Sequence, residues 1–304
     1  MKRITVWLIS AAILVLTTGA LKPSEMKLNV NGQVLTDLPS PIVVNGTAFI
    51  PIRAVHALGN YKVNWSSHDK TVTVFNPSTK DTVVLTVNKK TAYKNKTAIA
   101  LAVAPRTVQG TTYVPIHFIS ESFGAAVIWD NMQNGIVVVT PDPDNLGLVV
   151  SNDLPAARLG AIGLPRVSWH EESLPQPEGM TYAYLFPENE TKRFYFIKGS
   201  SVYFYEVKEN RYAELVWEAK IDLNQRNANE KDTLSKYLGH GFSPSIGTQP
   251  VIDKRLVYFQ DNTFINERGT FGIVDRSGTP LSKHEVKATR LSEIVIHVPE
   301  EGSE

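Results

Sequence analysis

The chain has 304 residues, of which 42% are hydrophobic and 20% are charged, a composition typical of a globular protein of one to three domains. Its 31 basic and 30 acidic side chains give a net charge of +1, so no excess of positive charge supports a nucleic-acid partner. Cysteine is absent, which excludes disulfides, thiolate metal sites, a cysteine nucleophile and lipid attachment at cysteine.

Residues 1–20 have the pattern of a signal peptide. Lys2 and Arg3 form a short basic head, residues 4–20 are apolar and uncharged, and the small residues Thr18 and Ala20 suit a cleavage site after residue 20. The alternative is an uncleaved membrane anchor, although 17 apolar residues are at the short limit for spanning a bilayer. We expect a secreted, cell-envelope-associated protein of Gram-positive type, with no membrane span in the mature chain if the leader is cleaved.

The sequence contains an internal repeat: the segment 45–59 is closely similar to the segment 109–124. The repeated residues are Gly46, Pro51, Gly59 and Trp65 in the first copy and Gly110, Pro115, Gly124 and Trp129 in the second. These are residues that serve turns, helix starts and burial, and none is a good nucleophile, acid or metal ligand. The repeat therefore predicts one scaffold unit built twice, over about residues 27–76 and 83–140.

Each unit is expected to contain a hairpin, a strand, a short helix and two further strands. Asn-Gly pairs at 31–32 and 45–46 predict tight turns, since both central positions favour positive φ. Pro51 and Pro115 follow short apolar strands and predict strand-to-helix junctions. Gly59 and Gly124 are expected to end the helices in a left-handed conformation.

This duplicated pattern, NG-x-x-φ-φ-P-φ-R followed by LG and V-x-W, resembles the stalk domain of the copper amine oxidase N-terminal domain-like family. That family occurs in exported Bacillus- and Paenibacillus-type proteins, and the resemblance covers about residues 27–140. It implies a small mixed α/β stalk without catalytic activity. The second copy departs from the pattern, with His117 where the first has Arg53. Arg53 and His117 either contact a ligand at the repeat interface or pair with a neighbouring carboxylate or carbonyl group.

The family name does not predict copper chemistry here. None of the seven histidines has His-x-His or His-x-x-x-His spacing, and the chain is too short for an oxidase catalytic domain. We therefore predict no copper amine oxidase activity, no cofactor and no metal site.

The second half of the chain is predicted to be β-rich. Residues 141–180 contain many prolines and glycines and are expected to form a linker and lead-in. Residues 181–304 form a domain of unknown family with strands over 193–199, 201–209, 211–221, 255–262, 270–280 and 292–300, and one short helix within 227–241. The fold class is thus α+β, with tandem stalk repeats followed by a β-rich domain.

The second half contains two kinds of candidate site, one aromatic and one with acid/base groups. Tyr203, Tyr205 and Trp217 would bind cell-wall sugars if they lie on an exposed face, or they belong to the core, because aromatic residues favour strands in any case. His170 beside Glu171 and Glu172, and His240 near Ser243, are the candidate acid/base groups. Metalloprotease, serine-elbow and phosphate-loop motifs are absent from the sequence.

The sequence predicts an exported, non-catalytic protein whose duplicated stalk acts as a structural or binding scaffold for cell-wall polymer or an envelope protein. The alternative is a secreted hydrolase with its site in residues 150–304 and the stalk as an attachment module. A pocket with convergent polar groups near His170 or His240 would favour the hydrolase.

Overall fold

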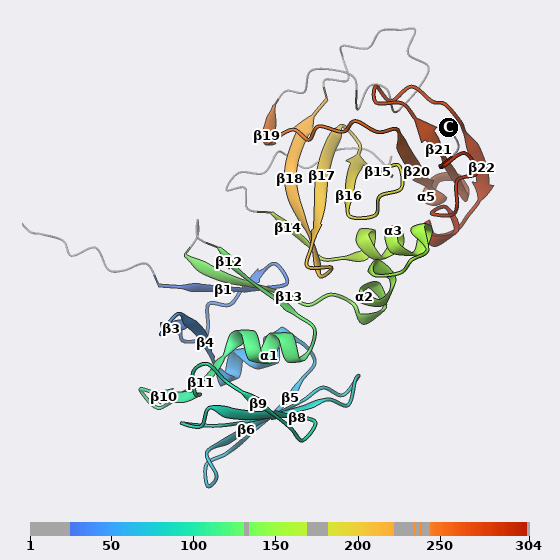
Figure 1. The fold of residues 1–304 in the computed structure, drawn as a ribbon. Helices are drawn as coiled ribbons and strands as arrows, with labels where there is room; N and C mark the ends of the chain where they lie inside the picture. The colour runs from blue at the N-terminus through green and yellow to red at the C-terminus, as the bar shows by residue number, and fades with distance from the viewer. Residues whose placement is uncertain are drawn as a thin grey trace, which may run out of the picture.

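The computed structural model describes residues 25–130, 134–168, 182–221, 234, 238 and 244–302. Figure 1 shows two bodies, one formed by β1 to β13 and the other by a large twisted sheet, with α2 and α3 at their junction. The α+β class with a β-rich second half is confirmed. Within the described ranges, no helix has the length and apolar character needed to cross a membrane. The proposed leader lies outside these ranges.

The N-terminal body contains both predicted copies, each with a short helix followed by two strands, but the second copy has one more strand before its helix than the first. The first copy comprises β1 (Lys27–Val30), β2 (Gln33–Val34), β3 (Ile42–Val44), β4 (Thr47–Pro51), the 3₁₀-helix η1 (Ile52–Leu58), β5 (Lys62–Ser66) and β6 (Thr71–Phe75). The second comprises β7 (Thr82–Thr86), β8 (Thr91–Lys94), β9 (Thr97–Ala100), β10 (Arg106–Val108), β11 (Thr111–Pro115), α1 (Ile116–Ser122), β12 (Ala126–Asp130) and β13 (Gly135–Val139). The predicted Asn-Gly turns are confirmed, with φ of 50° and 87° at Asn31 and Gly32 and 50° and 73° at Asn45 and Gly46.

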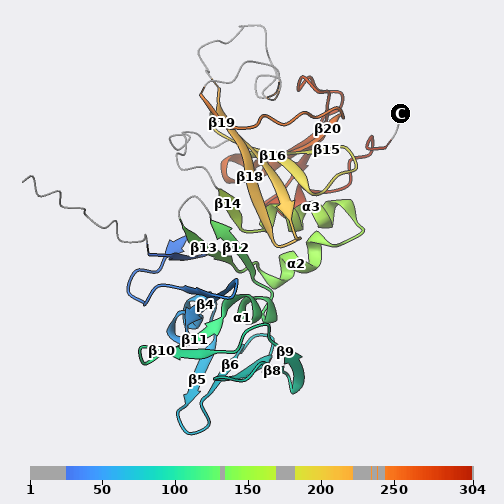
Figure 2. The same ribbon diagram turned by 60° about the vertical axis from the view of Figure 1, so that its left-hand side comes forward.

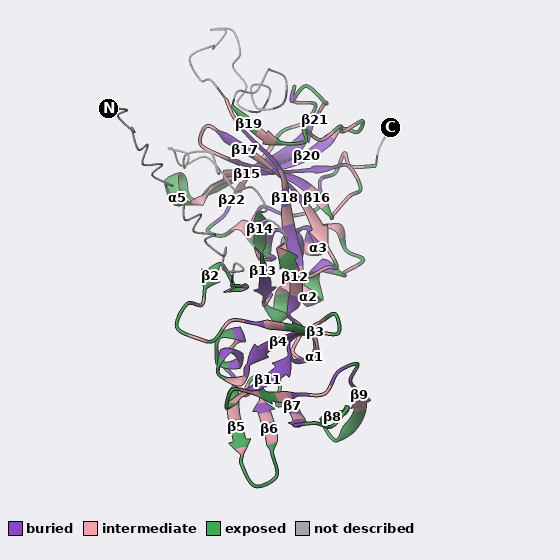
Figure 3. Ribbon diagram, turned by 90° about the vertical axis from the view of Figure 1, so that its left-hand side faces the viewer, coloured by how far each residue is buried: buried purple, intermediate pink, exposed green. Residues whose placement is uncertain are grey.

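The two copies are intertwined. Their central strands β4 and β11 pair antiparallel, and Ile50 lies opposite its repeat equivalent Val114, which places a local two-fold relation at that pair. The hairpin β1–β2 completes a sheet with β12 and β13, while β7, β8 and β9 extend the sheet of β5 and β6. One continuous hydrophobic core contains residues of both copies, including Ile50, Leu58 and Ile119. In Figure 3, β4 and β11 are buried while β5 and β9 expose much of their surface.

The two-fold relation does not extend to the strands that each copy pairs with the other copy's last strand, namely β7 with β6 and β1 with β13. β7 is antiparallel to β6, because only a short turn joins them, whereas β1 is parallel to β13. β1 and β13 lie at opposite ends of the body in sequence, so no hairpin dictates their relative direction.

The helix junctions are confirmed in part. Pro51 and Pro115 are the last residues of β4 and β11, and each immediately precedes its helix. Gly124 has the expected positive φ, of 84°. The prediction for Gly59 is wrong, since its φ of 170° is extended backbone. Glycine is favoured there by space instead, because a Cβ would lie 2.7 Å from the ring of the buried Tyr61.

The segment expected to be a linker and lead-in begins with two helices. Asp142 caps α2 (Pro143–Val149), and Asp153 caps α3 (Leu154–Gly163). Each aspartate accepts a hydrogen bond from a backbone N–H of the first turn, and a proline follows at the start of the helix. The Asp-Pro pair that suggests a linker is therefore a helix start. Figure 2 shows both helices between the two bodies.

The C-terminal body is one sheet in the order β14-β18-β17-β16-β15-β20-β21-β22, with β19 paired to β18. Its elements are β14 (Arg166–Ser168), β15 (Tyr182–Pro187), β16 (Arg193–Lys198), β17 (Ser201–Lys208), β18 (Tyr212–Lys220), β19 (Ser245–Gly247), β20 (Leu256–Asn262), α5 (Thr263–Asn266), β21 (Arg268–Val274), β22 (His284–Lys287) and the 3₁₀-helix η2 (Leu291–Glu293). One face packs against α2, α3 and the C-terminal segment, and the other forms a separate cluster around Trp217 and Leu234.

Two predictions for this body concern the strand expected over 292–300 and the helix expected within 227–241. The strand expected over 292–300 is wrong, because η2 begins this segment and the rest is irregular. Its apolar residues Ile294, Val295 and Val298 are buried against the sheet face, so they serve as core without pairing as a strand. The helix expected within 227–241 lies outside the described residues except for Leu234 and Leu238, which pack on the opposite face.

The two bodies are joined by direct contact as well as by the chain. Ala126, Val137 and Val139 form a cluster with Val167 and Tyr212 of the C-terminal body. Across the same junction, the Arg211 guanidinium donates to the carbonyl oxygen of Ala125 at 3.3 Å. The N-terminal body therefore contacts the C-terminal body through a packed surface.

Candidate functional site: a groove at the repeat interface

A surface groove of about 360 Å³ lies where the two copies meet. The first copy contributes β4, η1 and β5, and the second contributes the turn between β10 and β11. The lining residues are Pro39, Pro51, Ile52, Arg53, His56, Val63, Trp65, Gly110, Thr111 and Thr112. Four of the motif residues chosen from sequence, Pro51, Arg53, Trp65 and Gly110, thus line one groove.

The groove carries positive charge without a counterion. Arg53 and His56 are both exposed on η1, and none of the described lining residues is acidic. Among the described residues, no hydrogen bond or ion pair engages the Arg53 side chain. The alternative in which Arg53 pairs with a neighbouring carboxylate is therefore not what the structure shows.

Trp65 supplies an aromatic wall. Its side chain is 39% exposed, and its repeat equivalent Trp129 on β12 is exposed to the same extent. Trp65 lies two residues after Val63, which packs against the core shared by both copies. Because side chains alternate along β5, Trp65 and Val63 lie on the same side of this strand. Trp129 has no arginine equivalent beside it, because His117 takes the place of Arg53 in the second copy.

The groove includes residues that sequence reasoning did not select, namely Pro39, His56, Thr111 and Thr112. His56 follows Arg53 by one helical turn, which is a local signal. The threonines come from the other copy and line the same groove as Arg53 because β4 pairs with β11.

The three aromatic residues proposed to bind sugars do not share a surface. Trp217 is 1% exposed and lies opposite Phe204 within the cluster on one face of the sheet. Tyr203 and Tyr205 lie on the other face, where Tyr205 is 6% exposed. Strand alternation thus sends Trp217 and the two tyrosines to opposite faces, and Tyr203 is partly buried on its face.

Arg166 on β14 covers part of that tyrosine face. Its guanidinium carbon lies 4.2 Å from the ring centroid of Phe196 and 5.1 Å from that of Tyr205. Burial raises the pKa of Tyr205, and the charge of Arg166 opposes this effect. The ring surface is therefore already occupied by a side chain of the same domain.

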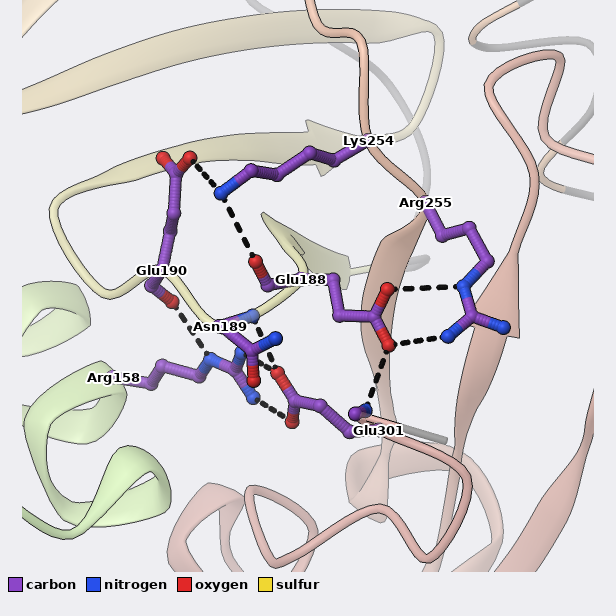
Figure 4. Close-up of polar contacts among 8 residues, drawn as sticks. Arg158, Glu188, Asn189, Glu190, Lys254, Arg255 and Glu301 are labelled. Atoms are coloured by element: carbon purple, nitrogen blue, oxygen red, sulfur yellow. Dashed lines mark hydrogen bonds and ion pairs between the residues drawn. The ribbon is translucent and has the colours of Figure 1, made fainter. Parts of the chain in front are cut away.

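A network of polar contacts, drawn in Figure 4, joins α3 to the C-terminal segment. The buried Arg158 guanidinium donates to both carboxylate oxygens of Glu301, and its Nε donates to the carbonyl oxygen of Glu190. Beside it, Glu188 accepts two hydrogen bonds from Arg255. Each charge shown in this cluster has a partner, so the arrangement is that of a structural clasp.

Glu188 and Glu190 of this clasp have lowered pKa values. Burial alone would raise the pKa of Glu188, but hydrogen bonds from Arg255 and the Gly302 N–H together lower it below its usual 4.5. The hydrogen bond from Arg193 is the largest cause that lowers the pKa of Glu190. Both groups are therefore held in the charged form.

A second hollow, of about 470 Å³, lies between the two bodies. Lys27, Asp130 and Arg166 are its described charged residues. Asp130 has an interaction partner and Arg166 is held over aromatic rings, so neither matches the unpartnered Arg53.

The N-terminal body is similar to a known domain family. Residues 29–138 match the family model of the copper amine oxidase N-terminal domain. This segment is thus similar to a non-catalytic, stalk-like module, as the repeat pattern suggested. The match ends before α2 and does not extend to the large sheet. A search of curated proteins gives no significant match.

The described residues contain no group of three or more His, Asp or Glu side chains placed to hold a metal ion. The hydrolase candidates His170, Glu171, Glu172, His240 and Ser243 lie outside the described residues, and the hydrolase alternative stays a prediction.

Proposed function

We propose that the chain is an exported, non-catalytic cell-envelope protein whose N-terminal module binds cell-wall polymer. The observation that carries this proposal is the exposed groove in which an unpartnered Arg53 stands beside Trp65. Similarity to a non-catalytic stalk-like domain supports binding rather than catalysis, and the apolar segment 4–20 after a basic head supports export.

The two-body arrangement supports a scaffold role for the module. The apolar junction around Val137 and Tyr212 holds the second domain against the stalk. A polymer bound in the groove would then position the C-terminal sheet relative to the wall.

Sedimentation with insoluble cell-wall material tests this function. The chain from residue 21 onward should sediment with wall material at 50 mM salt, and an Arg53→Gln/Trp65→Ala variant should lose at least tenfold of that binding. Trp129→Ala is the matched control, since Trp129 is equally exposed but lies outside the groove. Failure of the unaltered chain to sediment would refute wall binding.

Export has its own test. Expression of the full chain in a Gram-positive host should place the protein outside the membrane, with its mature N-terminus at residue 21. A chain retained in the cytoplasm would contradict the proposal.

A further inference from the structure

The groove has two chemically different walls. Pro39, Pro51, Val63 and Trp65 provide apolar surface, whereas Arg53, His56, Thr111 and Thr112 provide charge and hydroxyl groups. A ligand that fits both walls needs one apolar face and one edge rich in oxygen. The volume of about 360 Å³ is near the lower end for small-ligand pockets, which suits one or two sugar-sized rings.

The cationic wall selects an acidic group. Arginine presents a planar fork of N–H donors that matches a carboxylate or a phosphate in a bidentate pair. Arg53 is exposed and has no partner among the described residues, so no internal ion pair must break before a ligand binds. The described lining holds no acidic residue that would repel an anion.

The aromatic wall selects a ring. The flat surface of an indole packs against the C–H face of a pyranose, and a partly exposed tryptophan combines apolar surface with access to water. Trp65 has this exposure, at 39%. An extended nucleic acid is disfavoured because the chain carries a net charge of only +1 and shows no basic stripe in its sequence.

We propose that this groove binds a sugar residue that carries a carboxylate or phosphate group, with Arg53 on the acid and Trp65 against the ring. The inference rests on the proposed function, for which it names the ligand class. The hydroxyl groups of Thr111 and Thr112 supply further polar contacts from the second repeat. The site therefore exists only when both copies are folded together.

Titration calorimetry with defined oligosaccharides tests the ligand class, using the chain from residue 21 onward. The probes are an oligogalacturonate for the carboxylate, a glycerol-phosphate oligomer bearing sugar substituents for the phosphate, and a neutral chito-oligosaccharide as the reference. We expect one or both acidic probes to bind at least tenfold more tightly than the neutral probe, and the better of the two identifies the acid.

Variants locate the binding. Arg53→Gln and Trp65→Ala should each weaken acidic-probe binding at least tenfold, and Arg53→Lys should give an intermediate loss because it keeps the charge without the fork. Trp129→Ala should change affinity less than twofold. Since one cation holds one acidic group, affinity should fall no more than about fourfold between 50 and 200 mM salt.

Three results would overturn the proposal: equal binding of the neutral probe, equal losses in Trp129→Ala and Trp65→Ala, or no binding of either acidic probe at millimolar concentration. An acidic peptide that binds more tightly than both oligosaccharides would also overturn it. Wall sedimentation that survives Arg53→Gln, without oligosaccharide binding, would remove this ligand assignment and leave the wall-binding function. Oligosaccharide binding without wall sedimentation would remove the wall-binding function and leave this ligand assignment.

Discussion

Replacement of Arg158 by methionine should strongly destabilise the C-terminal domain. The Arg158 side chain is fully buried, and its partner Glu301 is 7% exposed. Methionine keeps much of the apolar length but removes the guanidinium, which also lies 5.4 Å from the Phe186 ring centroid. The Glu301 carboxylate would then stay buried with the Asn189 N–H as its main remaining donor.

Removal of one partner from a buried ion pair typically costs about 3–5 kcal/mol, because the other charge is left without compensation. We therefore expect Arg158→Met to lower the free energy of unfolding by about 3–5 kcal/mol. The double variant Arg158→Met/Glu301→Met should recover most of this loss, since it removes the buried charge as well.

Urea denaturation followed by far-UV circular dichroism measures this change. Arg268→Met is the control, since the Arg268–Glu285 pair is 3.5 Å apart and both side chains are more than half exposed. That substitution should change stability by less than about 0.5 kcal/mol. A cost below about 1 kcal/mol for Arg158→Met would refute the clasp as a source of stability.

Three further predictions concern packing, cation–π contact and pH. Gly160→Ala should destabilise by about 1–3 kcal/mol in a thermal melt, because its Cβ would clash with the backbone nitrogen of Val149, while Gly147→Ala has open space and should be neutral or slightly stabilising. Arg166→Gln should raise the pKa of Tyr205 further in an ultraviolet titration, because it removes the charge that opposes the effect of burial; an unchanged titration would contradict the contact. The lowered pKa values of Glu188 and Glu190 contribute stability that is complete above their unfolded-state pKa near 4.5 and is lost as pH falls through the lower folded values. The melting temperature should therefore fall as pH drops below about 4.5, with a shallower slope in Glu188→Gln/Glu190→Gln, and equal slopes would argue against these two groups.

Much of the local structure was predictable because it depends on neighbouring residues. The Asn-Gly turns follow from the tolerance of asparagine and glycine for positive φ, and the proline junctions follow from the missing N–H of proline. The meander of β16, β17 and β18 follows from period-two alternation. The helix starts at Asp142-Pro143 and Asp153-Leu154-Pro155 also carry a local signal, which a linker interpretation overlooked.

Contacts between distant segments decided the rest. The sequence shows two copies, but only strand pairing makes Ile50 and Val114 neighbours and brings Thr111 to Arg53. The sequence allows Tyr203, Tyr205 and Trp217 to be either a binding face or part of the core, and only the packing on each side of the sheet shows how far each is buried.

Distant contacts also decided the structure of the segment 292–300. Its alternating sequence suits a strand, but its apolar side chains pack against the sheet without strand pairing. By itself, the sequence determined the turns, the helix starts and the duplication, since each depends on the preferences of adjacent residues. The tertiary structure alone decided the intertwined core, the groove and the burial of the aromatic residues, because burial and pairing depend on residues far apart in the chain.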